Sequence, residues 1–117
     1  MPYQDLLAGL VELHVLYHAV HGEIFGLEML RELERHGYRI SPGTLYPLLH
    51  RLRHRGYLRS RELRLGRTRR RLYRATAKGR KALAVVHEHV QELLGELEER
   101  PARESRAIQA GAERTRS

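Results

Sequence analysis

The sequence predicts a mainly α-helical fold with one small β-hairpin and an added C-terminal helix. Apolar residues recur at helical spacing in four segments, near residues 5–20, 27–36, 42–54 and 77–99. Residues 57–74 instead alternate around a glycine-containing turn, as two antiparallel strands do. The length of 117 residues suits one domain with a modest hydrophobic core.

The first predicted helix, from about Asp5 to Val20, is apolar around most of its circumference. Asp5 is the predicted N-cap, since its carboxylate can accept a hydrogen bond from an early helical N–H. One face holds Leu6, Leu10, Leu13, Tyr17 and Val20, and the other side adds Leu7, Val11 and Val15. A helix this broadly apolar is either deeply buried or shared with another subunit. We therefore place Leu7 and Val11 in a predicted dimer interface.

The second predicted helix runs from about Leu27 to His36, after a connection over residues 21–26. Its apolar stripe is expected to consist of Leu27, Met29, Leu30 and Leu33. Gly37 follows the last turn and can take the left-handed conformation that ends a helix.

The third predicted helix begins at Ser41 and Pro42 and ends before Gly56. A serine hydroxyl can cap the first turn, and proline at the first helical position gives up a donor that has no partner there. The predicted core-facing stripe is Leu45, Leu48, Leu49 and Leu52. Pro47 removes one internal hydrogen bond, so we expect a bend or a delayed helix start. The opposite face is polar, basic and partly aromatic.

A β-hairpin is predicted next, with strands near residues 57–64 and 70–75. The turn between them is Leu65-Gly66-Arg67-Thr68, in which Gly66 supplies a positive φ. Thr76 is then a suitable N-cap for the last helix.

The last predicted helix covers residues 77–99 and carries a heptad-like apolar stripe. Its members are spaced 3, 4, 3 and 4 apart: Leu83, Val86, Val90, Leu93 and Leu97. We predict that the stripe from Val86 to Leu97 forms a dimer interface, with covering of its own domain as the alternative. Residues 100–117 contain one large apolar residue, Ile108, and are predicted to be a disordered tail.

The charge distribution points to an anionic partner. The net charge is +8, and half of the 22 Lys and Arg residues lie within residues 51–74 beside a single acid, Glu62. Such a basic segment favours nucleic acid first and an acidic membrane surface second. The alternative is an ordinary solvated face, which usually mixes acids among its bases.

The order of the elements is that of a winged helix-turn-helix with an added C-terminal dimerisation helix. The string Ser41-Pro42-Gly43-Thr44-Leu45-Tyr46-Pro47, continued by Leu48-Leu49-His50-Arg51-Leu52, resembles the PadR family of bacterial transcription regulators. The segment Leu72-Tyr73-Arg74-Ala75-Thr76-Ala77-Lys78-Gly79 is similar to the same family. The predicted organisation is a DNA-binding domain over residues 1–76, a dimerisation helix over 77–99 and a tail.

The resemblance implies a homodimer of the compact branch of the family, joined by the first and last helices. It also implies that the third helix enters the major groove and that the hairpin touches the flanking backbone or minor groove. The predicted DNA-binding residues are Ser41, Pro42, Gly43, Thr44, Tyr46, His50, Arg51, Arg67, Arg69 and Arg70.

The predicted function is therefore sequence-specific regulation of transcription, in the form of a repressor bound as a homodimer to an inverted repeat in double-stranded DNA. Arginine can bond a guanine edge bidentately, whereas hairpin arginines suit phosphate. Two alternatives stay open: a non-specific architectural protein that binds nucleic acid, and a sensor that responds to a metal or a small ligand.

Three histidines, His14, His18 and His21, lie along one stripe of the first helix. Imidazoles at positions i and i+4 can share a zinc ion. No carboxylate is spaced among the three, so we interpret them as polar residues that border an apolar face. We predict no metal and no cofactor.

The sequence contains no phosphate-binding loop, nucleophile elbow or HExxH string, so no enzymatic activity is predicted. A small hydrophobic effector between the first and last helices is compatible with the resemblance. The lack of a signal peptide, a long apolar run and cysteine favours a cytoplasmic protein that does not enter a membrane.

Overall fold

The computed structural model describes the backbone of residues 3–116 and the side chains of residues 3–99. The chain divides into two units, Met1–Leu83 and Ala84–Ser117. Within the described part of the chain, no helix is long and apolar enough to cross a membrane.

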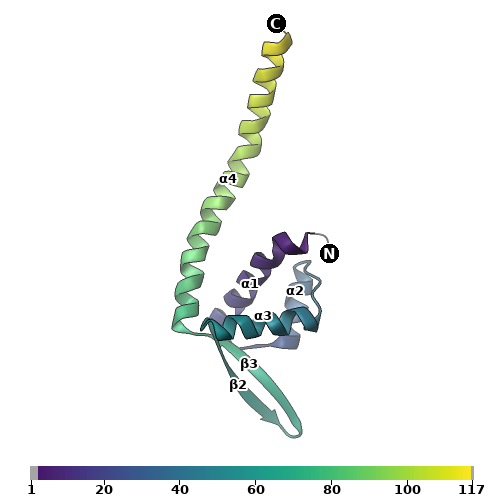
Figure 1. Cartoon of the computed structure of the whole chain (residues 1–117), viewed down its shortest axis with the longest axis vertical. Helices are drawn as coiled ribbons and strands as arrows, with labels where there is room; N and C mark the ends of the chain where they lie inside the picture. The colour runs from purple at the N-terminus through teal and green to yellow at the C-terminus, as the bar shows by residue number, and fades with distance from the viewer. Residues whose placement is uncertain (1–2, 117) are drawn as a thin grey trace. The chain divides into compact units, whose positions relative to one another are not determined.

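The first unit has the winged helix-turn-helix architecture (Figure 1). Its elements follow the order α1 (Gln4–His21), β1 (Ile24–Phe25), α2 (Gly26–Arg35), α3 (Pro42–His54), β2 (Leu58–Leu65) and β3 (Thr68–Ala75). The β2–β3 hairpin, here called the wing, projects from the three helices. This arrangement confirms the predicted fold class, and each predicted helix boundary in this unit lies within one or two residues of the observed one.

A two-residue strand was missed at the sequence level. Ile24 pairs with Tyr73 and Phe25 pairs with Leu72, so the sheet is antiparallel with the order β1-β3-β2. The sequence predicted only a connection over residues 21–26. Two residues are too few to show a period, and the strand exists because β3 supplies its hydrogen-bonding partner.

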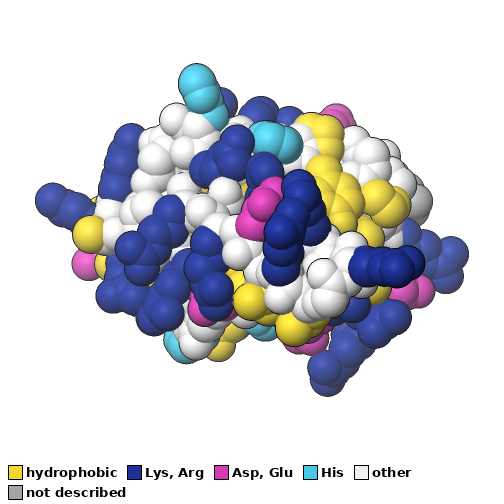
Figure 2. Space-filling model, turned by 90° about the horizontal axis from the view of Figure 1, so that it is seen from below, with side chains coloured by type: hydrophobic (Ala, Val, Ile, Leu, Met, Phe, Trp, Pro, Cys, Tyr) yellow, Lys and Arg dark blue, Asp and Glu magenta, His cyan; other side chains and the backbone are white. Residues whose placement is uncertain are grey.

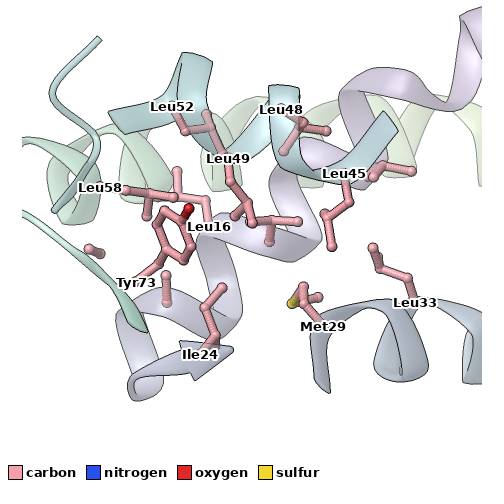
Figure 3. Packing of buried hydrophobic residues seen from close by; sticks show 14 residues of the cluster. Leu16, Ile24, Met29, Leu33, Leu45, Leu48, Leu49, Leu52, Leu58 and Tyr73 are labelled. Atoms are coloured by element: carbon pink, nitrogen blue, oxygen red, sulfur yellow. The ribbon is translucent and has the colours of Figure 1, made fainter. Parts of the chain in front are cut away.

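The core lies where the helices meet the base of the sheet (Figure 3). From α3, Leu45, Leu48, Leu49 and Leu52 are all buried, as their spacing predicted. They pack toward residues of α1, α2 and the sheet, namely Leu16, Ile24, Met29, Leu33, Leu58 and Tyr73. Burial of the leucine stripe fixes the rotation of α3, so its opposite face is turned outward.

The buried face of α1 differs from the predicted one. Val11, Val15, Leu16 and Ala19 are buried. Leu6 is 76% exposed, and Leu10 and Tyr17 are exposed as well. Val11 keeps only 4% of its surface, so its placement in a dimer interface is wrong: its own domain already covers it. Both sides of α1 are apolar, and only packing against α2 and the sheet decides which side is buried.

Two helix starts also differ from the prediction. Tyr3, not Asp5, is the N-cap of α1. At α3, the Ser41 side chain caps no backbone N–H in the described structure, and its hydroxyl lies 3.3 Å from the Thr44 hydroxyl. Pro42 does begin α3, as predicted, and the helix runs without a delayed start through Pro47.

The stripe of buried apolar residues on α2 is narrower than predicted. Met29 and Leu33 are buried, whereas Leu27 is 51% exposed. The helix ends as predicted: Gly37 has φ +86°, and the Tyr38 N–H donates to the Leu33 carbonyl at 2.9 Å. This pattern is a Schellman motif, and it places His36 at the last turn of α2.

The start of α4 (Ala77–Arg116) is tied to the junction between α3 and the wing. The Gly79 N–H donates to the Thr76 hydroxyl at 3.0 Å, which confirms the predicted cap. Lys78 donates to the Arg55 carbonyl at 2.6 Å. A Cβ at Gly79 would lie 2.2 Å from the Tyr57 carbonyl oxygen, so only glycine permits this approach. The Thr-x-Lys-Gly string therefore serves this junction.

The second unit is the continuation of α4 from Ala84. Its apolar stripe is largely exposed: Leu93 is 55% exposed and Leu97 is 60% exposed. The sequence predicted a helix end at Glu99 and a disordered tail, but α4 continues to Arg116. Alanine and arginine, which are frequent in this segment, are strong helix formers, and Pro101 does not end the helix.

Candidate nucleic-acid interface

The outward face of α3 is polar and exposed along its whole length. Because the leucines occupy one side, the residues predicted for DNA binding lie on the other, and all are exposed: Ser41, Pro42, Gly43, Thr44, Tyr46, His50 and Arg51. Pro47 and His54 extend the same face. An amphipathic helix with this division can enter a groove without loss of core packing.

Tyr46 is held at the edge of this face by α2. Its ring lies so close to Gly26 that a Cβ there would be 2.7 Å from Cε1 and 2.8 Å from the hydroxyl oxygen. Tyr46 remains 43% exposed, so part of its side chain can contact a phosphate or a base edge. The Tyr46 ring thus packs against the first residue of α2.

Arg51 lies on the flank of α3 next to α1. Its Nη2 is 3.6 Å from Oε1 of Glu12, and both side chains are partly exposed. Such a pair contributes little stability in water, about 0–1 kcal/mol. Arg51 can therefore leave Glu12 for a base edge at small cost.

The end of α3 forms a basic hollow that the sequence analysis did not single out. It is lined by His50, Arg51, Arg53, His54 and Arg55. The Arg53 guanidinium donates to the Ser60 hydroxyl at 3.0 Å and so joins α3 to the wing. In the sequence, the high density of arginines after Leu52 indicates that the basic surface continues from α3 into the wing.

The wing closes through a two-residue loop at Gly66 and Arg67, because Leu65 pairs with Thr68. Gly66 has φ +63°, and Arg67 does not have a positive φ. This combination is the one that a type II′ turn requires. Arg64 pairs with Arg69 and Arg59 pairs with Arg74 across the ladder. Like charges directly opposite each other destabilise a sheet, and an anionic partner would relieve that repulsion.

The wing and its surroundings present a basic surface. Figure 2 shows this end of the protein, where Lys and Arg side chains outnumber Asp and Glu. The predicted contacts Arg67, Arg69 and Arg70 are all exposed, as are Arg64 and Arg71.

Two wing arginines are held by the domain. Arg61 donates to both carboxylate oxygens of Glu23 at 2.7 and 3.0 Å, which lowers the pKa of Glu23 and raises the pKa of Arg61. The Arg70 guanidinium lies 5.5 Å from the centre of the Phe25 ring. These contacts anchor the wing to β1. Of the three predicted phosphate contacts, Arg70 is thus partly engaged within the domain.

The predicted histidine stripe is only partly brought together. His14 and His18 lie close to each other, but the ring N–H of His21 at Nδ1 donates to the Tyr17 carbonyl at 2.8 Å, and its ring lies against the Tyr17 ring. The third member of the cluster is His36, from the end of α2.

Comparison with known proteins decides the family. The model of the "Transcriptional regulator PadR-like family" matches residues 15–85, which is more than half of the chain. The chain belongs to this family. It is 48% identical over 87 residues to the transcriptional regulator Rv3488 of Mycobacterium tuberculosis, over 74% of this chain and 81% of the relative.

Solved structures have the same fold. A PadR family transcriptional regulator from Eggerthella lenta superposes with a TM-score of 0.72 at 30% identity, over 80% of this chain and 82% of that one. Bacillus subtilis PadR, solved in complex with operator DNA, has a TM-score of 0.58 at 19% identity, over 63% and 44% of the two chains. The family model and the Mycobacterium tuberculosis relative thus identify this chain as a transcriptional regulator, as the sequence predicted.

Proposed function

We propose that this PadR-like regulator is a homodimeric repressor that binds an inverted-repeat operator. In this proposal α3 enters the major groove and recognises bases, while the wing contacts the phosphate backbone. The observation that carries it is the division of α3 between four buried leucines and an outward face of hydroxyl, imidazole and guanidinium groups.

The two surfaces differ in chemistry, which supports separate roles. The α3 face offers Tyr46, His50 and Arg51, whose groups differ in geometry and can discriminate base edges. The wing tip offers repeated guanidinium groups, including Arg67 and Arg69, which suit phosphates irrespective of sequence. The crystallised PadR–operator complex of Bacillus subtilis has the same fold.

The exposed stripe of α4 supports dimer formation. Val86, Leu93 and Leu97 expose 39–60% of their surfaces to solvent, and Leu7 on α1 is partly exposed. A stripe of this spacing is typical of helices that pair with a second copy. Leu6 and Leu10 replace Val11 as the α1 candidates, because they are exposed on the same helix.

Footprinting on genomic DNA fragments tests the operator proposal. Two-fold symmetry requires inverted half-sites about one helical turn, roughly 34 Å, or a multiple of it apart. Discrete inverted repeats, together with lower transcription from a promoter that contains one, are expected. Diffuse coverage would instead indicate an architectural protein.

Sedimentation of two matched variants tests the dimer. Val90→Glu places a charge in the apolar stripe, whereas Gln91→Glu places the same charge on the next residue, away from the stripe. We expect a dimer for the wild type and Gln91→Glu at micromolar concentration, and a monomer for Val90→Glu. A monomeric wild type contradicts the proposal.

A further inference from the structure

A cluster of three histidines lies between α1 and the end of α2. His14 and His18 are one turn apart on α1, and His36 follows the last turn of α2. One ligand nitrogen from each lies within 4.8 Å of the others. The His14 and His36 rings are stacked with their centres 5.2 Å apart.

A carboxylate lies beside two of these histidines. The Glu32 Oε1 lies 3.2 Å from Nε2 of His36 and 3.9 Å from Nε2 of His18. No acid is spaced among the histidines of α1 in the sequence, and Glu32 belongs to a different helix. The fold therefore brings three nitrogen donors together and places a carboxylate oxygen beside two of them.

The spacing of these donors is close to that of a tetrahedral metal site. Zinc binds histidine nitrogen at about 2.0–2.1 Å, which puts tetrahedral ligands about 3.3 Å apart. Because the three nitrogens lie within 4.8 Å of one another, the rings need to close by at most about 1.5 Å. His36 can make this movement, since its side chain is 48% exposed.

We propose that His14, His18 and His36, with Glu32, bind one divalent transition-metal ion of the zinc class. Zinc, cobalt and nickel accept imidazole and carboxylate ligands, whereas magnesium and calcium prefer oxygen alone. The ion ties α1 to the end of α2, two helices that also contribute Val15 and Leu33 to the core. The site does not depend on the operator proposal.

Metal titration of the full-length protein tests the site. After chelator treatment, the protein is titrated with Zn²⁺ and with Co²⁺, whose visible absorption reports tetrahedral coordination. We expect one ion per chain and a rise in melting temperature of about 10 °C at a zinc concentration one hundred times Kd.

Single substitutions assign the ligands. His36→Ala is the principal variant, because His36 is exposed and its loss leaves the core intact. His36→Ala and Glu32→Gln are expected to abolish the cobalt absorption and the zinc-dependent rise in melting temperature. His21→Ala is the matched control, since His21 lies on the same helix but bonds the Tyr17 carbonyl instead. A second control, His87→Ala with His89→Ala, removes the histidines of α4.

Both controls are expected to bind the metal as the wild type does. Equal binding by the wild type and His36→Ala would mean an adventitious ion only and would overturn the site. Absence of stoichiometric binding by the wild type would overturn it as well.

Discussion

The helix α3 and the wing are neighbours in the chain, but the fold holds them differently. Four leucines of α3 are buried in the core, whereas at the wing tip Leu65 is 57% exposed and residues 66–71 are all exposed. The wing is anchored nearer its base by Arg61 on Glu23 and by the Arg53–Ser60 hydrogen bond. A helix face that is fixed by core packing can recognise the geometry of nucleobase edges. A wing tip that is held only near the start of its strands is better suited to contacts with phosphate charge, which need less exact geometry.

The largest expected difference between the two regions is in stability. Leu49→Ala removes a fully buried side chain of α3 and should lower the free energy of unfolding by about 2–5 kcal/mol. Leu65→Ala removes an exposed one at the wing tip and should change it by less than about 0.5 kcal/mol. Urea unfolding measures both. Comparable losses would show that the wing tip is part of the cooperative core.

Base recognition should depend on α3. Arg51→Ala should cost roughly 1–3 kcal/mol in discrimination for the preferred base, if Arg51 makes a bidentate base contact as we propose. The measurement is the ratio of operator affinity to scrambled-DNA affinity. An unchanged ratio, with both affinities lowered, would move Arg51 to the phosphate contacts.

Salt dependence should belong to the wing. Arg67→Ala with Arg69→Ala should weaken operator and scrambled DNA alike, and it should flatten log affinity against log salt by about 1.8, since each phosphate contact contributes about 0.9. Titrations at several salt concentrations give the slope. Selective loss of the operator would reverse our assignment of roles.

A smaller effect is expected from the contact between Gly26 and Tyr46. Gly26→Ala puts a Cβ 2.7 Å from Tyr46 Cε1, so the ring must shift, while the flexible end of the tyrosine allows folding. Operator affinity should fall, and the free energy of unfolding should change by about 1 kcal/mol or less. Gly9→Ala, which meets nothing within 4 Å, is the control. Unchanged affinity would mean that Tyr46 does not contact DNA.

The smallest effect is expected at Glu12. Glu12→Gln removes the acid whose Oε1 lies 3.6 Å from Nη2 of Arg51. It should raise DNA affinity by up to about fivefold, because Arg51 no longer has to give up an exposed ion pair worth about 0–1 kcal/mol. In the Arg51→Ala background the same substitution should change little, which a double-mutant cycle measures. A gain that persists without Arg51 would instead reflect the change in net charge.

Three parts of the prediction are not tested by the structure. A small hydrophobic effector stays a prediction, as do the dimer and the identity of the operator. The metal prediction illustrates the limit of helical spacing. Spacing selected His14, His18 and His21, yet the structure replaces His21 with His36 and adds Glu32, both from another helix.

The sequence by itself determined the order of the helices and the hairpin, the leucine stripe of α3, the glycine at the turn of the wing and the threonine cap of α4. These depend on local chemistry: the 3.6-residue period, positive φ and capping act within a few residues. Only the tertiary structure decided the strand β1, the buried side of α1 and the partners of Arg51, Tyr46 and His36. Each of these depends on atoms brought together from distant parts of the chain, and α1, apolar on both sides, has no local preference for one of them.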